Sequence, residues 1–280
     1  MQFKKRKKAG KYVRAVIQLI FFLLMPSAFT TAFAGVKYIF TQIGQETQLE
    51  MTAFVTVLLV LGIYTIVFGR FFCGFACAFG SLSDAVRAFY VWICKKMKKK
   101  PVTIGDSVTI KLKYLKYVVL AAVVLLCFLG LYGKLQGTSP WDVFSMLHAG
   151  NLRLQKYLAG AVILILIVIG MCVRERFFCL FLCPMGAVFA LLPVLPFFTF
   201  RRNREKCLKG CRACTRQCPA ALNLPDDKNP GVSGDCFQCQ KCADICPGGN
   251  IHCSGMAGNE IPVTIVKAAV LFGILFWLGV

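Results

Sequence analysis

The chain has 280 residues, of which 58% are hydrophobic and 16% charged, and its formal net charge is +21 at pH 7. This apolar composition excludes an ordinary soluble domain and is typical of an integral membrane protein. The basic residues lie at the ends of apolar segments rather than in one patch, so the pattern argues against nucleic acid as a partner and indicates anchoring to membrane lipid.

Five apolar segments approach the length of about 20 residues that a helix needs to cross a bilayer. They are Val13 to Ala34, Met51 to Gly69, Tyr117 to Tyr132, Tyr157 to Val173 and Val263 to Val280. Stretches 1–11, 70–113 and 174–241 are strongly basic, and loops 35–50 and 133–156 are not. The positive-inside rule then predicts a multi-pass protein with its N-terminus in the cytoplasm and its C-terminus outside. We expect the membrane to be a bacterial or archaeal cytoplasmic membrane.

An internal repeat organises the apolar part of the chain. The sequence RFFCGFACAFG at residues 70–80 returns as RFFCLFLCPMG at residues 176–186, each time after a pair of apolar segments. Parallel repeats of this kind favour two helical hairpins packed about a pseudo-twofold axis, which would bring the motifs together. The first segment also has the look of a signal peptide, but its removal would destroy half of the first unit, so we interpret it as a retained helix.

Each repeat carries a C-x3-C pair, Cys73 with Cys77 and Cys179 with Cys183. On a helix, this spacing places both thiols on one face. The pairs could hold an iron-sulfur centre or another metal, act as dithiols, or pack as small apolar side chains. Their recurrence with the same flanking residues favours a redox or metal role. The apolar stretches that follow them, 79–94 and 186–200, are too interrupted for full spans and are predicted to be interfacial or re-entrant helices.

Two four-cysteine runs, each ending in Cys-Pro, follow the second repeat. The run Cys236, Cys239, Cys242 and Cys246 has the C-x2-C-x2-C-x3-C-P spacing of bacterial two-cluster ferredoxins. The run Cys207, Cys211, Cys214 and Cys218 has one extra residue in its first gap.

In two-cluster ferredoxins the fourth cysteine of each run binds the other cluster. We therefore predict two [4Fe-4S] clusters, and we name their ligand sets for use below. The peripheral cysteine group is Cys207, Cys211, Cys214 and Cys246, and the central cysteine group is Cys218, Cys236, Cys239 and Cys242. Zinc is the alternative for such a ligand set, and disulfides are disfavoured in the reducing cytoplasm.

The remaining polar features are less specific. Cys94, Cys127, Cys172 and Cys253 follow no repeated spacing and are expected to pack as apolar residues. The loop around Trp141 and His148 could hold a quinone, although an aromatic residue of the membrane interface is the preferred interpretation. A basic surface could steer an acidic ferredoxin or flavodoxin, or bind anionic lipid. It consists of Arg201, Arg202, Arg204, Lys206 and Lys209.

With these motifs in place, the chain resembles the membrane polyferredoxin family, which includes the quinol-oxidising subunit associated with periplasmic nitrate reductase. The resemblance covers nearly the whole chain and implies electron transfer between redox partners and the quinone pool or a flavin. In that family, proline typically follows the second cysteine of each C-x3-C pair. Cys183 has Pro184, but Cys77 is followed by Ala78, which suggests a relaxed role for the first pair.

We therefore predict an all-α integral membrane protein with about five transmembrane helices, as two repeated hairpins plus one, and a cytoplasmic bacterial-type double-cubane ferredoxin domain. The predicted domains are a first membrane repeat (1–113), a second membrane repeat (114–200), the ferredoxin domain (201–260) and a final transmembrane helix (261–280). The predicted function is electron relay between the clusters and the quinone pool, or an extracytoplasmic flavin or reductase. A metal-reducing assembly factor for a respiratory oxidase and a redox-sensing regulator are the alternatives.

Overall fold

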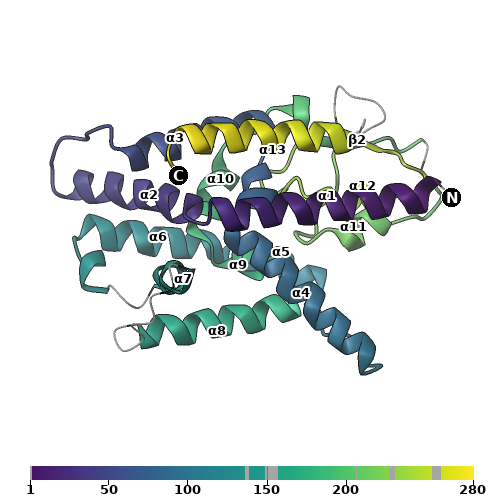
Figure 1. The fold of residues 1–280 in the computed structure, drawn as a ribbon, viewed down its shortest axis with the longest axis horizontal. Helices are drawn as coiled ribbons and strands as arrows, with labels where there is room; N and C mark the ends of the chain where they lie inside the picture. Colours follow the sequence, from purple (N-terminus) through teal and green to yellow (C-terminus); the bar gives the residue numbers. More distant parts are fainter. Residues whose placement is uncertain are drawn as a thin grey trace.

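The computed structural model describes residues 2–135, 139–148, 150, 157–205, 207–226, 231–253 and 260–280. Long helices run side by side along the molecule, and the cysteine-rich segment with α11, α12 and β2 lies at the same end as the N-terminus (Figure 1). The first repeat contains α1 (Gln2–Leu24), α2 (Ala28–Gly44), α3 (Ala53–Phe68), η1 (Phe72–Ala76), α4 (Ala78–Lys96) and α5 (Asp106–Leu112). The second contains α6 (Leu115–Phe128), η2 (Tyr132–Leu135), α7 (Pro140–His148), α8 (Leu158–Val173), α9 (Phe177–Phe181), α10 (Pro184–Leu191) and η4 (Pro196–Phe198).

The first apolar segment is two helices, not one. The expectation of a continuous span from Val13 to Ala34 is wrong, because α1 ends at Leu24 and α2 begins at Ala28 after a bend of 62°. Pro26 lies in the break. Proline has no N–H to donate and restricts the residue before it, so it ends the first helix there.

The two repeats are interleaved around their motifs. The helix after the first motif, α4, packs on α8 of the second repeat. The chain after α10 in turn reaches α3 of the first repeat, where the Leu195 N–H donates to the Ile66 carbonyl at 2.8 Å. The segment that follows each motif therefore packs against the other repeat.

Few of the described helices are long and apolar enough to cross a bilayer. Among the described residues, α13 (Glu260–Trp277) alone is long and apolar enough to cross a bilayer by itself, and the bent pair α1–α2 qualifies when taken together. Helices α3 and α8 are apolar but have 16 residues each, and five crossings stay a prediction.

The cysteine-rich segment contains two short helices, α11 (Ala213–Gln217) and α12 (Lys241–Ile245), and two short strands. Strand β1 (Phe200–Arg202) pairs antiparallel with β2 (Ile251–Cys253), with Phe200 opposite Cys253. These strands depart from the all-α prediction. They join the start and the end of the segment, so the cysteines between them form one compact unit.

Helix α13 is fastened to both parts of the molecule. The Tyr64 hydroxyl of α3 donates to the Lys267 carbonyl at 2.9 Å, and the Lys267 ammonium donates to the Phe198 carbonyl at 2.8 Å. The Gln240 side-chain amide, next to α12, donates to Thr264 of α13. The last helix is thereby fixed against the first repeat and the cysteine-rich segment.

Replacing Gly35 by alanine is expected to lower stability by about 1–3 kcal/mol. Its Cβ would lie 2.5 Å from the Phe54 carbonyl oxygen, so α2 and α3 would have to separate. Gly62→Ala in α3 is the matched control, because its Cβ would meet only the Leu192 Cδ1 at 3.9 Å. Thermal unfolding in detergent compares the two, and equal melting temperatures would contradict the close packing of α2 on α3.

Candidate iron-sulfur and thiol sites

Each repeated motif interrupts its helix between its two cysteines. Cys73 lies in the single π-helical turn η1, and Cys77 has extended backbone angles and caps the start of α4. Cys179 lies in α9, and Cys183 caps the start of α10 in the same way. The expectation that each pair shares one face of a continuous helix is therefore wrong, because the second cysteine leaves the helical conformation.

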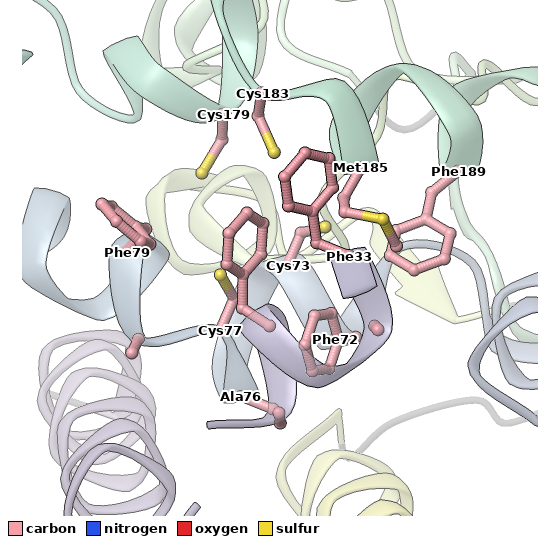
Figure 2. Packing of buried hydrophobic residues seen from close by; sticks show 14 of the residues in the cluster. Phe33, Phe72, Cys73, Ala76, Cys77, Phe79, Cys179, Cys183, Met185 and Phe189 are labelled. Carbon is pink, nitrogen blue, oxygen red and sulfur yellow. The ribbon is translucent and has the colours of Figure 1, made fainter. Parts of the chain in front are cut away.

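The four motif cysteines lie together in the core. We call them the membrane-edge thiols, Cys73, Cys77, Cys179 and Cys183. They are at most 5% exposed, and Figure 2 shows the pair from each motif on either side of a shared space. Cys183 interacts electrostatically with the other three, and Cys77 with Cys73 and Cys179. The repeat thus assembles a cluster of four thiols.

Backbone amides at helix starts face two of these thiols. The Gly186 N–H donates to the Cys183 sulfur at 3.2 Å, and the amides of Phe79 and Gly80 act on Cys77 in the same way. Free amides at a helix start favour a thiolate. Although Ala78 replaces proline, Cys77 has the same capping position as Cys183, so the structure gives no sign of a relaxed role for the first pair.

Burial opposes ionisation of the free thiols. It raises the pKa of Cys179 to about 12 and also raises the pKa of Cys77 and Cys183 above their usual range. These thiols therefore carry protons at neutral pH in the absence of a metal. A metal or cluster bound by them must displace those protons, so its binding is pH-dependent.

The arginine and glycine at the ends of the repeated motif have reciprocal roles that the sequence analysis missed. Arg176 of the second motif lies over Gly80 of the first, 3.2 Å from the place of a Cβ there. Arg70 of the first motif lies over Gly186 of the second, with a distance of 3.0 Å. Neither arginine is more than 1% exposed. Both copies of the motif contain this arginine and this glycine as well as the cysteines, and that repetition could have indicated their role.

The buried guanidinium of Arg176 is held by backbone and by a carboxylate. It donates to the carbonyls of Cys73 and Gly74, the latter at 2.7 Å, and to Asp84 at 2.6 Å. Asp84 also contacts Lys241 of the cysteine-rich segment at 3.3 Å. Burial opposes ionisation of Asp84, but the charges of Arg176 and Lys241 outweigh it and hold the pKa of that carboxyl well below its usual range.

Asp235 is the counter-ion of Arg70, as Asp84 is of Arg176. It lies 3.7 Å from Arg70 and 3.2 Å from Lys113, and it also pairs with Lys116. Burial again opposes its ionisation, and the hydrogen bond and charge of Lys116 together with the charge of Arg70 lower its pKa. Asp235 directly precedes Cys236, so this pairing fixes the cysteine-rich segment onto the membrane repeats.

The central cysteine group converges on one cavity. Its four members line one apolar pocket together with Cys214. Cys242 interacts electrostatically with the other three. Burial raises the pKa of Cys236 to about 12 and that of Cys218 to about 11, while backbone N–H groups donate to both sulfurs. Grouped thiols that accept backbone N–H bonds fit an iron-sulfur cluster, whose potential such bonds adjust.

The peripheral cysteine group lies partly at the surface. Cys214 and Cys246 are buried in the same small core beneath the β-strands, and the Asn250 N–H donates to the Cys246 sulfur at 3.4 Å. Cys207 is half-buried and Cys211 is exposed. Cys211 opens into a hollow lined by three arginines, which are Arg202, Arg204 and Arg212.

None of these groups is a closed single-ion site. Within the described ranges, no three histidine, cysteine, aspartate or glutamate side chains approach as closely as the ligands of one metal ion. Zinc needs four ligands at about 2 Å from one ion, whereas the four cysteines of a [4Fe-4S] cluster are distributed over its irons.

The cysteines outside the three groups and the loop around Trp141 show no further cluster of ligands among the described residues. Cys94, Cys127 and Cys253 are buried and Cys172 is half-buried. The Trp141 indole donates to the Tyr132 hydroxyl at 3.2 Å. Lys206 and the side chain of His148 lie outside the described residues.

Comparison with known proteins identifies the family to which the chain belongs. The family described as "4Fe-4S binding domain" matches twice, at residues 49–100 and 158–204, so that each match contains one C-x3-C pair. The uncharacterized protein MJ0749 of Methanocaldococcus jannaschii is 30% identical over 191 residues, 68% of this chain and 67% of that protein. The chain belongs to the membrane polyferredoxin family.

Two further relatives are similar to most of this chain. The uncharacterized protein MJ0750 of the same organism is 29% identical over 241 residues, which covers 84% of this chain and 91% of that protein. The ferredoxin-type protein NapH of Escherichia coli is 26% identical over 193 residues, 66% of this chain and 61% of NapH. No solved structure matches the chain.

Replacing Asp84 by asparagine is expected to destabilise this polyferredoxin by about 3–5 kcal/mol, because it leaves the charge of Arg176 buried without its counter-ion. The control is Asp106→Asn, whose carboxylate is 51% exposed beside Arg174, and which should cost about 1 kcal/mol or less. Thermal unfolding of both variants in detergent measures the difference, and similar losses would contradict the importance of the buried pair.

Stability is also expected to fall in acid. Asp84 and Asp235 have lowered pKa values in the folded state. Their contribution is therefore complete above the unfolded carboxyl pKa of about 3.9 and is lost as the pH falls through the folded values. Unfolding measured between neutral pH and strong acid should show this loss in the wild type and a smaller one in Asp84→Asn.

Proposed function

We propose that this chain is a membrane-bound electron-transfer protein that relays electrons between two cytoplasmic [4Fe-4S] clusters and a third centre at the membrane-edge thiols. From there electrons would pass to or from the quinone pool, or an extracytoplasmic flavin or reductase. The observation that carries the proposal is that members of two groups of four cysteines, the central group and the membrane-edge thiols, interact with the same two buried arginines, Arg70 and Arg176.

The central and peripheral cysteine groups would each hold one cluster. When bound, each cluster supplies a one-electron redox couple at a potential set by charge, hydrogen bonds and exposure. The chain's own contribution is to hold the sulfurs, to donate backbone N–H bonds to them and to exclude water around the central group. The more exposed peripheral group is the one that a soluble partner could reach.

The membrane-edge thiols would hold a further iron-sulfur or metal centre. Four thiols supply the ligands, and the amides of two helix starts together with two buried arginines nearby supply the positive charge that thiolates require. The match of the iron-sulfur family to both repeats supports this assignment. Packing alone would not explain why two charged residues are buried beside the thiols.

The proposal includes the membrane topology predicted from the sequence, with about five crossings and a cytoplasmic ferredoxin domain. Helices α3 and α8 support it because they expose large apolar side chains outward. Examples are Leu59 and Ile63 on α3, and Ile165 and Leu166 on α8, all at least 49% exposed. A lipid-facing surface accounts for such exposure.

The arginine-lined hollow beside Cys211 supports an acidic soluble electron carrier, such as a ferredoxin or flavodoxin, as the cytoplasmic partner. Positive charge around an exposed redox group speeds encounter with an acidic protein in a salt-dependent way. Arg212 was not part of the predicted basic surface, but it lines the same hollow as Arg202 and Arg204.

Iron and acid-labile sulfide per chain, with EPR of the anaerobically purified and reduced protein, test the proposal. Two clusters give about eight irons, and a third iron-sulfur centre adds more. The extra signal should disappear in a Cys73→Ser, Cys179→Ser double variant, with the ferredoxin signals retained. Cys127→Ser, which alters a buried cysteine outside every group, is the control.

Three other outcomes would contradict parts of the proposal. About eight irons and no third signal would leave the membrane-edge thiols without a cofactor. Zinc without any EPR signal would overturn the iron-sulfur assignment as a whole. A third signal that survives the double variant would place that centre elsewhere.

A further inference from the structure

Phe237 lies where the cysteine-rich segment meets the membrane-edge thiols. It directly follows Cys236 and is 3% exposed. The guanidinium carbons of Arg70 and Arg176 lie 4.7 Å and 5.3 Å from the centre of its ring. Both distances are within the range of a cation–π contact, about 6 Å. One aromatic ring of the ferredoxin segment thus contacts the leading arginine of each repeated motif.

The backbone at Phe237 is equally close to the first motif. A Cβ on Gly74 would collide with the Phe237 carbonyl oxygen. Gly74 directly follows Cys73, so only glycine permits this approach at a position next to a membrane-edge thiol. Gly69 likewise lies against the side chain of Gln238. The ferredoxin segment and the first motif are therefore in van der Waals contact at Gly69 and Gly74.

The charges of the two arginines also act on thiols of the two groups. Arg176 interacts with Cys239 of the central group and with Cys179 of the membrane-edge thiols. Arg70 interacts with Cys73, Cys179 and Cys183. An electron added to a buried centre adds negative charge in a medium of low dielectric, where a nearby fixed cation has its greatest effect.

We propose that Phe237, held by Arg70 and Arg176, is the junction through which electrons pass between the cluster at the central cysteine group and the centre at the membrane-edge thiols. The inference rests on the proposed third centre. In the step, one electron leaves the reduced cluster at the central group and enters the oxidised centre at the membrane-edge thiols. No covalent bond forms or breaks and no proton is transferred. Phe237 and the arginines act as positioning residues.

The wild-type protein provides the first test, independent of any variant. Because Arg176 interacts with thiols of both groups and Phe237, next to Cys236, packs on Gly74, next to Cys73, the two centres would lie close together. The EPR signal of the third centre should therefore be split or broadened by spin coupling to the neighbouring cluster. A third signal without such coupling overturns the junction and leaves the third centre standing. Absence of a third signal overturns the third centre, and the junction with it.

The second test replaces the ring. Phe237→Leu keeps an apolar side chain but removes the aromatic contact with both arginines. After mixing with a reduced viologen and rapid freezing, the ferredoxin signals should appear as in the wild type. The third signal should be delayed by between about tenfold and about a hundredfold, the latter being the loss that a misplacement of about an ångström can cause. Iron content should be unchanged.

The matched control is Phe21→Leu, which makes the same change at a position that is 1% exposed. Phe21 packs on Phe272 of α13 with ring centres 5.8 Å apart. This variant should keep the wild-type delay. An equal delay in the two variants, or no delay in Phe237→Leu, overturns the junction.

Arg176→Lys decides the question if Phe237→Leu fails to assemble its clusters. Lysine keeps the positive charge but cannot lie flat on the ring while donating to both Asp84 and the Gly74 carbonyl. The same selective delay of the third signal is expected, together with a changed midpoint potential of the third centre in an EPR-monitored titration. Wild-type kinetics in this variant would overturn the junction.

Discussion

The rest of this structure depends on the burial of two guanidinium groups. Arg70 and Arg176 have almost no contact with water, and a buried charge is tolerated only when paired and hydrogen-bonded. Each therefore requires a carboxylate, and Arg176 also uses backbone carbonyls of the opposite motif. The carboxylates come from different parts of the chain, Asp84 from the first repeat and Asp235 from the ferredoxin segment. This requirement joins three segments that are far apart in sequence.

The same constraint explains the arrangement of the thiols. Helices α4 and α10 begin at a cysteine, so their free amides and the two arginines supply positive potential at the same place. The glycine three residues after each capping cysteine leaves space for the arginine of the other motif. In this fold, the motif R-F-F-C-x3-C-x2-G is therefore half of a site, and two copies complete it.

Much of this could be predicted from the sequence. The spacing of the cysteine runs and the repeated motif are local patterns, and they were sufficient to identify the family and to expect the two C-x3-C pairs to meet. The break of the helix at Cys77 was not predictable, because no proline follows that residue. The packing of Arg70 over Gly186 brings together residues that are distant in sequence, and only the packed structure shows it. The bend at Pro26 was overlooked because hydrophobicity continues across it.

The placement of Asp235 has a consequence for biogenesis. The first repeat leaves the ribosome long before Asp235 is made, so during synthesis Arg70 lacks the carboxylate that it has in the finished protein. Arg176 has its partner Asp84 already available when it emerges. The second repeat can thus dock as soon as it is inserted, whereas the first motif stays electrostatically incomplete until the ferredoxin segment folds against it. Completion of the packing around the first motif is therefore coupled to folding of the ferredoxin segment.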